Sequence, residues 1–347
     1  MLKSAVTILD VARVAGVSKS AVSIALTGNG RLSEDTKTMI LQVAGEMGFE
    51  PNSNARRLQS KGLSNSVGLF TLDLDLSVGT RKIKAIRRLL TKQSFDVPIH
   101  SCSYQYDGHL SNTVREMRLL CQQRPRAIIC NTTDLPVEVL SAFQGYRADG
   151  GVLVCYDRPV NVECDQVVFD REDNTYQAAK HLLELGHRGI GFFEGGRLEP
   201  TSARVQGLTR ALAEFGLQPK AEWLFGSACY GEFEDDGVKM ATYFLDLPQK
   251  PSAVCIVNDY AALAFISEVQ RAGLSVPEDV SVVGHDDRPV ARYCNVPLTS
   301  VSQPVDAIAQ SVVDLLLERL NGDCEAPFRQ QTLRGELVVR QSTRAFS

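Results

Sequence analysis

Polar side chains that could bind a small hydroxylated molecule follow four apolar runs of this 347-residue chain. They are Asp73 and Asp75 after residues 67–70, Asp157 and Arg158 after 151–155, Asn258 and Asp259 after 253–257, and Asp286 and Asp287 after 280–284. Carboxylate, amide and guanidinium groups can each engage two adjacent hydroxyls, as recognition of a polyol requires. Asp and Asn also favour turns for local reasons, so turn capping stays open as the alternative role of Asp157, Asn258, Asp286 and Gln303.

Sequence patterns for catalysis or metal binding are weaker than this pattern of polar residues after apolar runs. Residues 189–196 (GIGFFEGG) superficially resemble a dinucleotide-binding loop, but Glu194 stands at the third glycine position, where its charge would oppose a pyrophosphate. The sequence has neither a P-loop nor a nucleophile elbow, and its five histidines lack the spacing of metal ligands. We therefore expect no enzymatic activity, no metal and no cofactor.

The charge distribution separates a basic head from an acidic body. The net charge is −4, yet residues 1–62 hold eight Lys and Arg against five Asp and Glu, which leaves +3 there and −7 in the rest. This fits a nucleic-acid-binding module joined to another unit, although a solvated helical face has the same composition.

Cysteine usage and the N-terminal segment indicate a cytoplasmic protein. The nine cysteines are scattered without any Cys-x-x-Cys pair, which predicts buried free thiols. Residues 1–17 are interrupted by charges, so we expect neither a signal peptide nor a membrane helix there.

Three short helices are predicted in the first 48 residues. Apolar residues at helical spacing in 8–15 end at Gly16, Ser18 can cap a second helix over 19–26, and Ser33 can cap a third. Two short helices joined at a glycine indicate a helix-turn-helix motif, whereas a bundle without a DNA role would bury the same apolar residues. The deciding residues are the outward ones, which are Lys19, Ser20, Ser23 and Arg31.

This segment resembles the headpiece of the lactose/galactose repressor (LacI/GalR) family of bacterial transcription regulators. The resemblance rests on Thr7-Ile8-Leu9-Asp10-Val11-Ala12, Ala15-Gly16-Val17-Ser18 and Val22-Ser23, and continues through 49–58 and, more diffusely, to about residue 340. It implies an all-α helix-turn-helix headpiece (1–48), a hinge helix and linker (49–62), and an α/β sensor of two parallel-sheet lobes like a periplasmic binding protein.

The resemblance also implies which residues contact DNA. Lys19, Ser20 and Ile24 would face base edges in the major groove with Arg31 just beyond, and Ser18, which caps the same helix, belongs to this surface. Thr7, Ser23, Ser33 and Asn52 would contact phosphates, which suit helix N-termini. Ile24 stands where several members carry Arg; it could touch a thymine methyl but not donate to guanine, or it could pack on the turn.

The hinge is expected to form a short helix that starts at Pro51 and presents Ala55 and Leu58 on one face. Such a helix is marginal alone. The resemblance implies that two copies pack together in the minor groove and that paired Leu58 side chains open the central base step, whereas without it Leu58 is a linker residue. A homodimer on a pseudo-palindromic duplex operator follows from that arrangement.

Apolar runs typical of strands alternate with helical patterns from residue 66 onward, which predicts an α/β fold. Strands are expected at 67–70, 127–130, 151–155, 167–169, 190–193, 253–257 and 280–284, and helices at 80–93, 109–123, 136–147, 172–185, 201–215, 232–246, 259–272 and 304–320. The first lobe is expected to hold 63–160 plus about 292–322, and the second 161–291 plus about 323–341. Crossovers are expected near 158–162, 289–293 and 321–326.

An effector is expected between the lobes, at the carboxyl ends of their strands. The segment 201–207 resembles the family's Arg-x-x-Gly signature, which implies that Arg204 reaches into this cleft, with an interlobe or helix-end salt bridge as the alternative. Asp73, Asp157, Asn258, Asp286 and Gln303 complete the expected site. Ligand identity stays open because 74–77 lacks the family's Asn-Pro-Phe stretch, and because His285 replaces the usual aromatic residue. His285 could add pH sensitivity or a hydrogen bond, or could be a core histidine.

These observations predict a sequence-specific DNA-binding regulator, a repressor of a metabolic operon, whose DNA affinity a sugar or sugar derivative controls allosterically. An enzyme and an exported solute receptor are the alternatives. Missing catalytic motifs argue against the first and residues 1–62 against the second. Residues 340–347 show no leucine heptads, so a coiled-coil tetramer is not expected.

Overall fold

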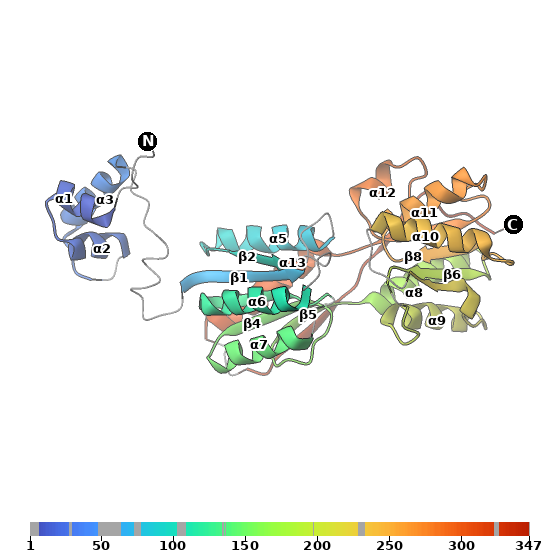
Figure 1. The fold of residues 1–347 in the computed structure, drawn as a ribbon, viewed down its shortest axis with the longest axis horizontal. Helices are drawn as coiled ribbons and strands as arrows, with labels where there is room; N and C mark the ends of the chain where they lie inside the picture. The colour runs from blue at the N-terminus through green and yellow to red at the C-terminus, as the bar shows by residue number, and fades with distance from the viewer. Residues whose placement is uncertain are drawn as a thin grey trace. The chain divides into compact units, whose positions relative to one another are not determined.

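The computed structural model describes residues 7–27, 30–47, 64–72, 78–102, 109–133, 135, 137–196, 198–227, 233–322 and 326–346. The chain divides into two compact units, Met1–Ser64 and Asn65–Ser347 (Figure 1). The predicted hinge residues Asn52, Ala55 and Leu58 lie outside the described residues, as do Asp73 and Asp75.

The first unit contains the three predicted helices, α1 (Ile8–Ala15), α2 (Lys19–Thr27) and α3 (Glu34–Glu46). Gly16 ends α1 in the left-handed conformation with φ 65°, which glycine adopts without steric cost. Val11, Val22 and Ile40, one from each helix, are fully buried and form the centre of a small core. The apolar spacing read from the sequence therefore predicts the three helices correctly, although Met39, expected on the inner face of α3, is exposed.

The second unit contains two six-stranded sheets, each flanked by helices (Figure 1). Around the first sheet lie β1 (Ser64–Leu72), α5 (Val78–Lys92), β2 (Ile99–Cys102), α6 (His109–Gln122), β3 (Pro125–Asn131), α7 (Val137–Ala148), β4 (Val152–Asp157), β5 (Asp165–Phe169), α13 (Val305–Leu320) and β11 (Gln330–Leu333). The second comprises α8 (Arg171–Glu184), β6 (Ile190–Glu194), α9 (Ala203–Glu214), the 3-10 turn Ala221–Trp223, β7 (Leu224–Gly226), α10 (Phe233–Asp246), β8 (Ala253–Ile256), α11 (Asp259–Arg271), β9 (Ser281–Asp286), α12 (Pro289–Tyr293), β10 (Thr299–Ser302) and β12 (Leu337–Val338).

The two sheets share one strand order. The first runs β11-β5-β4-β3-β1-β2 and the second β12-β10-β9-β8-β6-β7, so that β4 corresponds to β9 and β1 to β6. The edge strands β11 and β12 differ in direction, because β11 is parallel to β5 whereas β12 is antiparallel to β10. Two lobes of parallel α/β architecture are thus present, as the sequence predicted.

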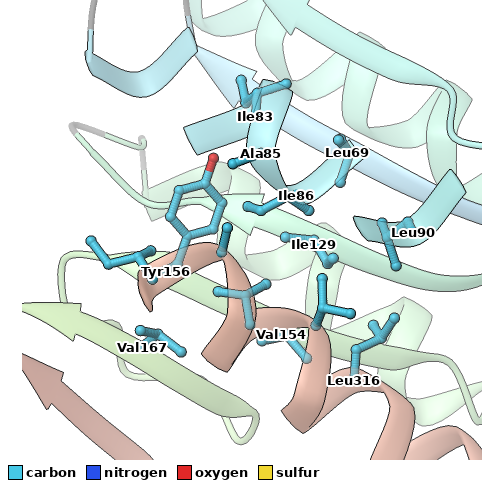
Figure 2. Packing of buried hydrophobic residues seen from close by; sticks show 14 of the residues in the cluster. Leu69, Ile83, Ala85, Ile86, Leu90, Ile129, Val154, Tyr156, Val167 and Leu316 are labelled. Carbon is cyan, nitrogen blue, oxygen red and sulfur yellow. The ribbon is translucent and has the colours of Figure 1, made fainter. Parts of the chain in front are cut away.

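Helices α5 and α13, far apart in the sequence, cover one face of the first sheet together (Figure 2). Ile86 and Leu90 from α5 and Leu316 from α13 are fully buried against Val154 of β4. Burying each such side chain contributes roughly 1.5–3 kcal/mol, so α13 belongs to the core of the first lobe although it follows the whole second lobe in sequence.

The predicted crossovers between the lobes are wrong in position. Strand β5 pairs with β4, so the chain leaves the first sheet only after Phe169 and not near 158–162. Residues 289–293 form α12, and the unpredicted strand β10 keeps the chain in the second sheet to Ser302. The third crossover follows β11 rather than preceding it, because β11 pairs with β5. The lobe boundaries at 160/161, 291/292 and 322/323 shift accordingly, since an apolar run indicates a buried strand but not which sheet it joins.

The cysteines in the described part of the chain are free thiols. Cys102, Cys130, Cys155, Cys164 and Cys255 are buried, as the sequence predicted, whereas Cys121 and Cys294 are only half-buried. None of the described helices is both long enough and apolar enough to cross a membrane.

Candidate DNA-binding surface and effector site

Helix α2 presents a polar surface to solvent. Ser18 caps the helix by accepting a hydrogen bond from the backbone N–H of Ala21 at 3.1 Å. Lys19 and Ser20 are exposed, and Ser23 lies four residues after Lys19, on the same side of the helix. The predicted base-reading and phosphate-binding side chains of α2 therefore share one side of this helix, and Arg31 beyond it is exposed.

Ile24 packs on the turn that follows α2. Three of its side-chain carbons lie only 3.0–3.1 Å from the position that a Cβ on Gly30 would occupy, and the residue is half-buried. Gly30 has no side chain, which leaves room for Ile24, and its φ of 145° is one that other residues rarely adopt. A larger residue at position 30 would clash with Ile24. The packing role considered for Ile24 is present, and a thymine contact by the same side chain stays a prediction.

Thr7 and Ser33 mark the N-termini of α1 and α3. The hydroxyl of Thr7 accepts from the Asp10 backbone N–H at 3.3 Å, and the Thr7 backbone N–H donates to the Asp10 carboxylate at 3.0 Å, which forms a capping box. Ser33 accepts from the backbone N–H of Thr36 at 3.2 Å. Both residues thus cap a helix N-terminus, where the helix dipole favours negative charge, and their contacts with phosphate stay predictions.

Asp157, at the end of β4, joins the two lobes through two cations. Its Oδ2 lies 2.6 Å from Nζ of Lys82 in α5, and its Oδ1 lies 2.6 Å from Nη2 of Arg171, the first residue of α8 in the second lobe. Arg171 also donates to the backbone carbonyl of Asp157 at 3.0 Å. Burial alone would raise the pKa of Asp157, but Lys82 and Arg171 together lower it. Asp157 is therefore an interlobe anion rather than a turn cap.

Sequence reasoning missed Lys82 and Arg171. Lys82 is fully buried, and this burial lowers its pKa while the Asp157 carboxylate opposes the shift. A signal was available, because Lys82 lies in the apolar stripe of α5 between Gly79 and Ile86, where a charge needs a partner. Arg171 offered no such signal, since a basic residue at the start of an amphipathic helix is ordinarily solvated.

Arg204 forms an ion pair within the second lobe that is only partly exposed. Its Nη1 lies 2.8 Å from Oε1 of Glu194 at the end of β6, and the two side chains are only 18% and 13% exposed. Burial lowers the pKa of Arg204, Glu194 opposes this, and the positive charges of Arg171 and Arg158 add to the lowering. The structure thus contains the helix-end salt bridge considered for Arg204. The charges of Arg158 and Asp286, which belong to the predicted strand-end groups, also affect the pKa of Arg204.

Asp286 and Gln303 meet at the ends of β9 and β10. Nε2 of Gln303 donates to Oδ1 of Asp286 at 2.5 Å. Oε1 of Gln303 is buried, and no group in the described chain hydrogen-bonds to it. The charge of Asp286 acts on both Lys82 and Arg204, which are in different lobes, so these groups form one electrostatic network.

His285 is buried beside this network but is not a fully satisfied core residue. Its Nδ1 lies 2.8 Å from the carbonyl oxygen of Ile256, which can only accept, so this nitrogen carries the proton. Burial and the nearby Arg204 lower its pKa to about 4, and the ring is neutral at pH 7. Nε2 is then a buried acceptor, and within the described residues it has no hydrogen-bond partner.

Asn258 and Asp259 have structural roles in the second lobe. Oδ1 of Asn258 accepts from the backbone N–H of Ala261 at 2.9 Å and caps α11, which was the alternative considered for this residue. The carboxylate of Asp259 accepts from the backbone N–H of Arg288 and from Ser300 Oγ, each at 2.6 Å. Of the predicted effector residues, the structure thus brings Asp157, Arg204, Asp286 and Gln303 into one network.

Two family models match separate parts of the chain. The model of bacterial regulatory proteins of the lacI family matches residues 7–52, and that of the periplasmic binding protein-like domain matches residues 179–343. These ranges cover the described headpiece and most of the second lobe with α13.

Curated relatives match over nearly their whole length. The HTH-type transcriptional repressor PurR of Aliivibrio salmonicida is 28% identical over 338 residues, which cover 97% of this chain and 98% of that protein. The NTD biosynthesis operon regulator NtdR of Bacillus subtilis is 27% identical over 97% of this chain and 99% of its own. These relatives are transcription regulators and not enzymes.

Solved structures match in the same way. The Lac repressor dimer bound to operator and the anti-inducer ONPF superposes with a TM-score of 0.83 at 25% identity, covering 99% of this chain and 100% of that one. A second Lac repressor structure, bound to ONPG in the repressed state, gives a TM-score of 0.81 at 26% identity and covers 98% and 100% of the two chains. The headpiece, the two equal sheets and the near full-length matches lead to one conclusion: the chain belongs to the LacI family of bacterial transcription regulators.

Proposed function

We propose that this protein represses a metabolic operon by binding a pseudo-palindromic operator as a homodimer, and that a small-molecule effector in the sensor unit controls its affinity for DNA. One observation carries the proposal, namely that the chain combines two units. The first is a helix-turn-helix that exposes Lys19 and Ser20 on α2, and the second is a two-lobed body with charged side chains withdrawn from water at its strand ends. Such a regulator works where the DNA is, in the cytoplasm.

The DNA-binding surface consists of two kinds of residue. Lys19, Ser20 and Ile24 read base edges, because an α-helix that fits the major groove places such side chains against them. Ser18 and Arg31 flank these three residues, Thr7, Ser23, Ser33 and Asn52 contact phosphates, and Ala55 and Leu58 from the hinge lie in the minor groove. The similar Lac repressor, which binds operator as a dimer, supports binding of this chain to an operator as a homodimer.

The effector site consists of Asp157, Arg204, Asp286 and Gln303, with Asp73 and Asn258 as further contributors. These side chains present carboxylate, guanidinium and amide groups, which suit a carbohydrate. Arg171 links α8 to Asp157 in the other lobe, so an effector that competes for either group would change the angle between the lobes. Only a difference in effector affinity between the two lobe arrangements can shift DNA binding.

An enzymatic role is not part of the proposal. The relatives that match over nearly their whole length are transcription regulators, which supports a regulator rather than an enzyme. Turnover of a sugar or nucleotide by the purified protein would refute this exclusion.

Electrophoretic mobility shift with genomic fragments tests the function. We expect retarded complexes with a small set of fragments, with the logarithm of affinity falling linearly with the logarithm of salt concentration by about 0.9 per phosphate contact. A chain that stays monomeric and binds no duplex would refute the proposal. A thermal-shift screen of sugars, sugar acids, sugar phosphates and purines then identifies the effector class, because a ligand that binds only the folded state raises Tm.

A further inference from the structure

We propose that Glu194 makes the effector site select a neutral polyol and reject anionic sugar derivatives. This inference rests on the effector site proposed above. In the sequence Glu194 is only a departure from a dinucleotide-binding loop, whereas in the structure it is the partner of Arg204. The proposal assigns a specificity-determining role to a residue outside the predicted site.

Arg204 is the group to which an anionic ligand would bind. A guanidinium group presents a planar fork of N–H donors that fits carboxylate and phosphate oxygens in a bidentate manner. Glu194 already engages Nη1 of Arg204 at 2.8 Å, and both side chains are largely withdrawn from water. The chain therefore supplies its own anion at the place where an anionic effector would anchor.

A ligand carboxylate or phosphate could reach Arg204 only in two ways, and both are unfavourable. If it displaced Glu194, a largely buried carboxylate would lose its counter-ion. If it shared Arg204 with Glu194, two anions would meet in a medium of low dielectric constant. A neutral hydroxyl meets neither obstacle, because it can accept from Arg204 and donate to Glu194.

The neighbouring polar atoms favour the same ligand class. Nε2 of His285 and Oε1 of Gln303 are buried acceptors without a donor in the described part of the chain. Asp286, next to both, is an acceptor as well and already receives Nε2 of Gln303. Acceptors need donors, and hydroxyl groups provide them, whereas ionised carboxylate groups and fully deprotonated phosphate esters can only accept.

The competing interpretation is an anion site built from several arginines. Arg158 and Arg171 lie close enough to Arg204 for their charges to act on it. Arg171, however, is bound to the Asp157 carboxylate at 2.6 Å, and Arg204 to Glu194. Carboxylates of the chain itself thus neutralise Arg171 and Arg204. These two guanidinium groups can still donate hydrogen bonds to ligand hydroxyls, but they no longer offer a free charge to an anion.

Inorganic phosphate is the probe that separates the two interpretations. It is titrated into the full-length wild type and the variants Glu194→Gln, Arg204→Ala and Glu194→Gln/Arg204→Ala at constant ionic strength set with potassium chloride, and Tm is recorded. We expect no saturable response in the wild type. We expect a saturable rise of at least about 2 °C in Glu194→Gln, because the amide keeps the size of the side chain but leaves Arg204 without its anion. The double variant should lose that rise.

Glu172→Gln is the matched control. Glu172 pairs with Arg210 at 2.5 Å on the exposed side of α8 and α9, so its substitution removes the same charge outside the site. Three results would each overturn the proposal. The first is a saturable response of Tm to phosphate in the wild type that Arg204→Ala abolishes. The second is the absence of a response in Glu194→Gln, and the third is a response in Glu172→Gln equal to that in Glu194→Gln. Because Tm reports on the sensor unit without DNA, this result is independent of the mobility-shift test of the regulatory function.

Discussion

Asp157 and Asp286 occupy equivalent positions in the two lobes. Each is the last residue of its strand, β4 or β9, and these strands hold the same place in the common sheet order. Each has a positive φ, 100° for Asp157 and 97° for Asp286, which is uncommon for a residue other than glycine. Strain of this kind persists where the surroundings hold the residue in place, and here it sets two carboxylates at the ends of the central strands.

Asp157→Asn should destabilise the sensor unit by about 3–5 kcal/mol, because it removes the carboxylate that pairs with the fully buried Lys82. Urea unfolding followed by circular dichroism measures the change. The control is Lys82→Met, which removes the buried ammonium while Arg171 still neutralises Asp157, and it should cost much less. Equal losses in the two variants would mean that Lys82 does not depend on Asp157 for its charge.

His285 should make the protein less stable as the pH falls from 6.5 to 4. The folded state holds the pKa of His285 at about 4, so in this window the unfolded chain takes up a proton that the folded chain does not. The loss attributable to this group approaches roughly 3 kcal/mol, since each pH unit corresponds to about 1.4 kcal/mol. His285→Gln should flatten the stability profile between pH 6.5 and 4, measured by urea unfolding at each pH. A parallel displacement of the two profiles would contradict the assignment.

Arg204→Ala should leave operator binding intact and abolish the effect of the effector on it. The reason is that Arg204 lies in the sensor unit, in contact with Glu194 at the strand ends. Mobility shift with and without the compound found by thermal shift measures both properties. Arg210→Ala, which removes an exposed arginine of the same helix, should retain the response. Equal responsiveness of the Arg204 variant and the wild type would refute its role.

Lys19→Ala should weaken binding to the preferred operator by about 1–3 kcal/mol and relax discrimination at one base position. The exposed Lys19 side chain has no competing role in the headpiece core, so the fold should tolerate its removal. Competition with single-base operator variants measures the discrimination. Lys92→Ala, a matched loss of charge on the sensor unit, should change neither quantity. A uniform loss over all sequences would mean that Lys19 contacts phosphate instead of a base.

Local patterns predicted the helices and most strands, because each amphipathic stripe or buried run is set by neighbouring residues. Sheet membership depends on partners far away in the chain, which is why the short strands β5 and β10 led to wrong crossovers. The short strands β2 and β7 gave too weak a pattern to be expected at all.

The residues of the candidate site likewise divide into those that local patterns predict and those that depend on partners far away in the chain. Asp157, Asp286 and Arg204 could be found from strand ends and from the family signature. Lys82, Glu194 and Arg171 could not be paired with them, since each ion pair joins residues from different elements. Whether Asn258 caps a helix or faces a ligand likewise depends on the backbone N–H it meets, which spacing does not reveal.

The late position of α13 in the chain has a consequence for synthesis on the ribosome. The first lobe needs α13 and β11 to cover one face and one edge of its sheet, and these segments come after residue 304. Translation therefore delivers nearly all of the second lobe before the first can close, while the headpiece is complete within its first 64 residues. A nascent chain can thus present a finished DNA-binding module well before it possesses a working sensor.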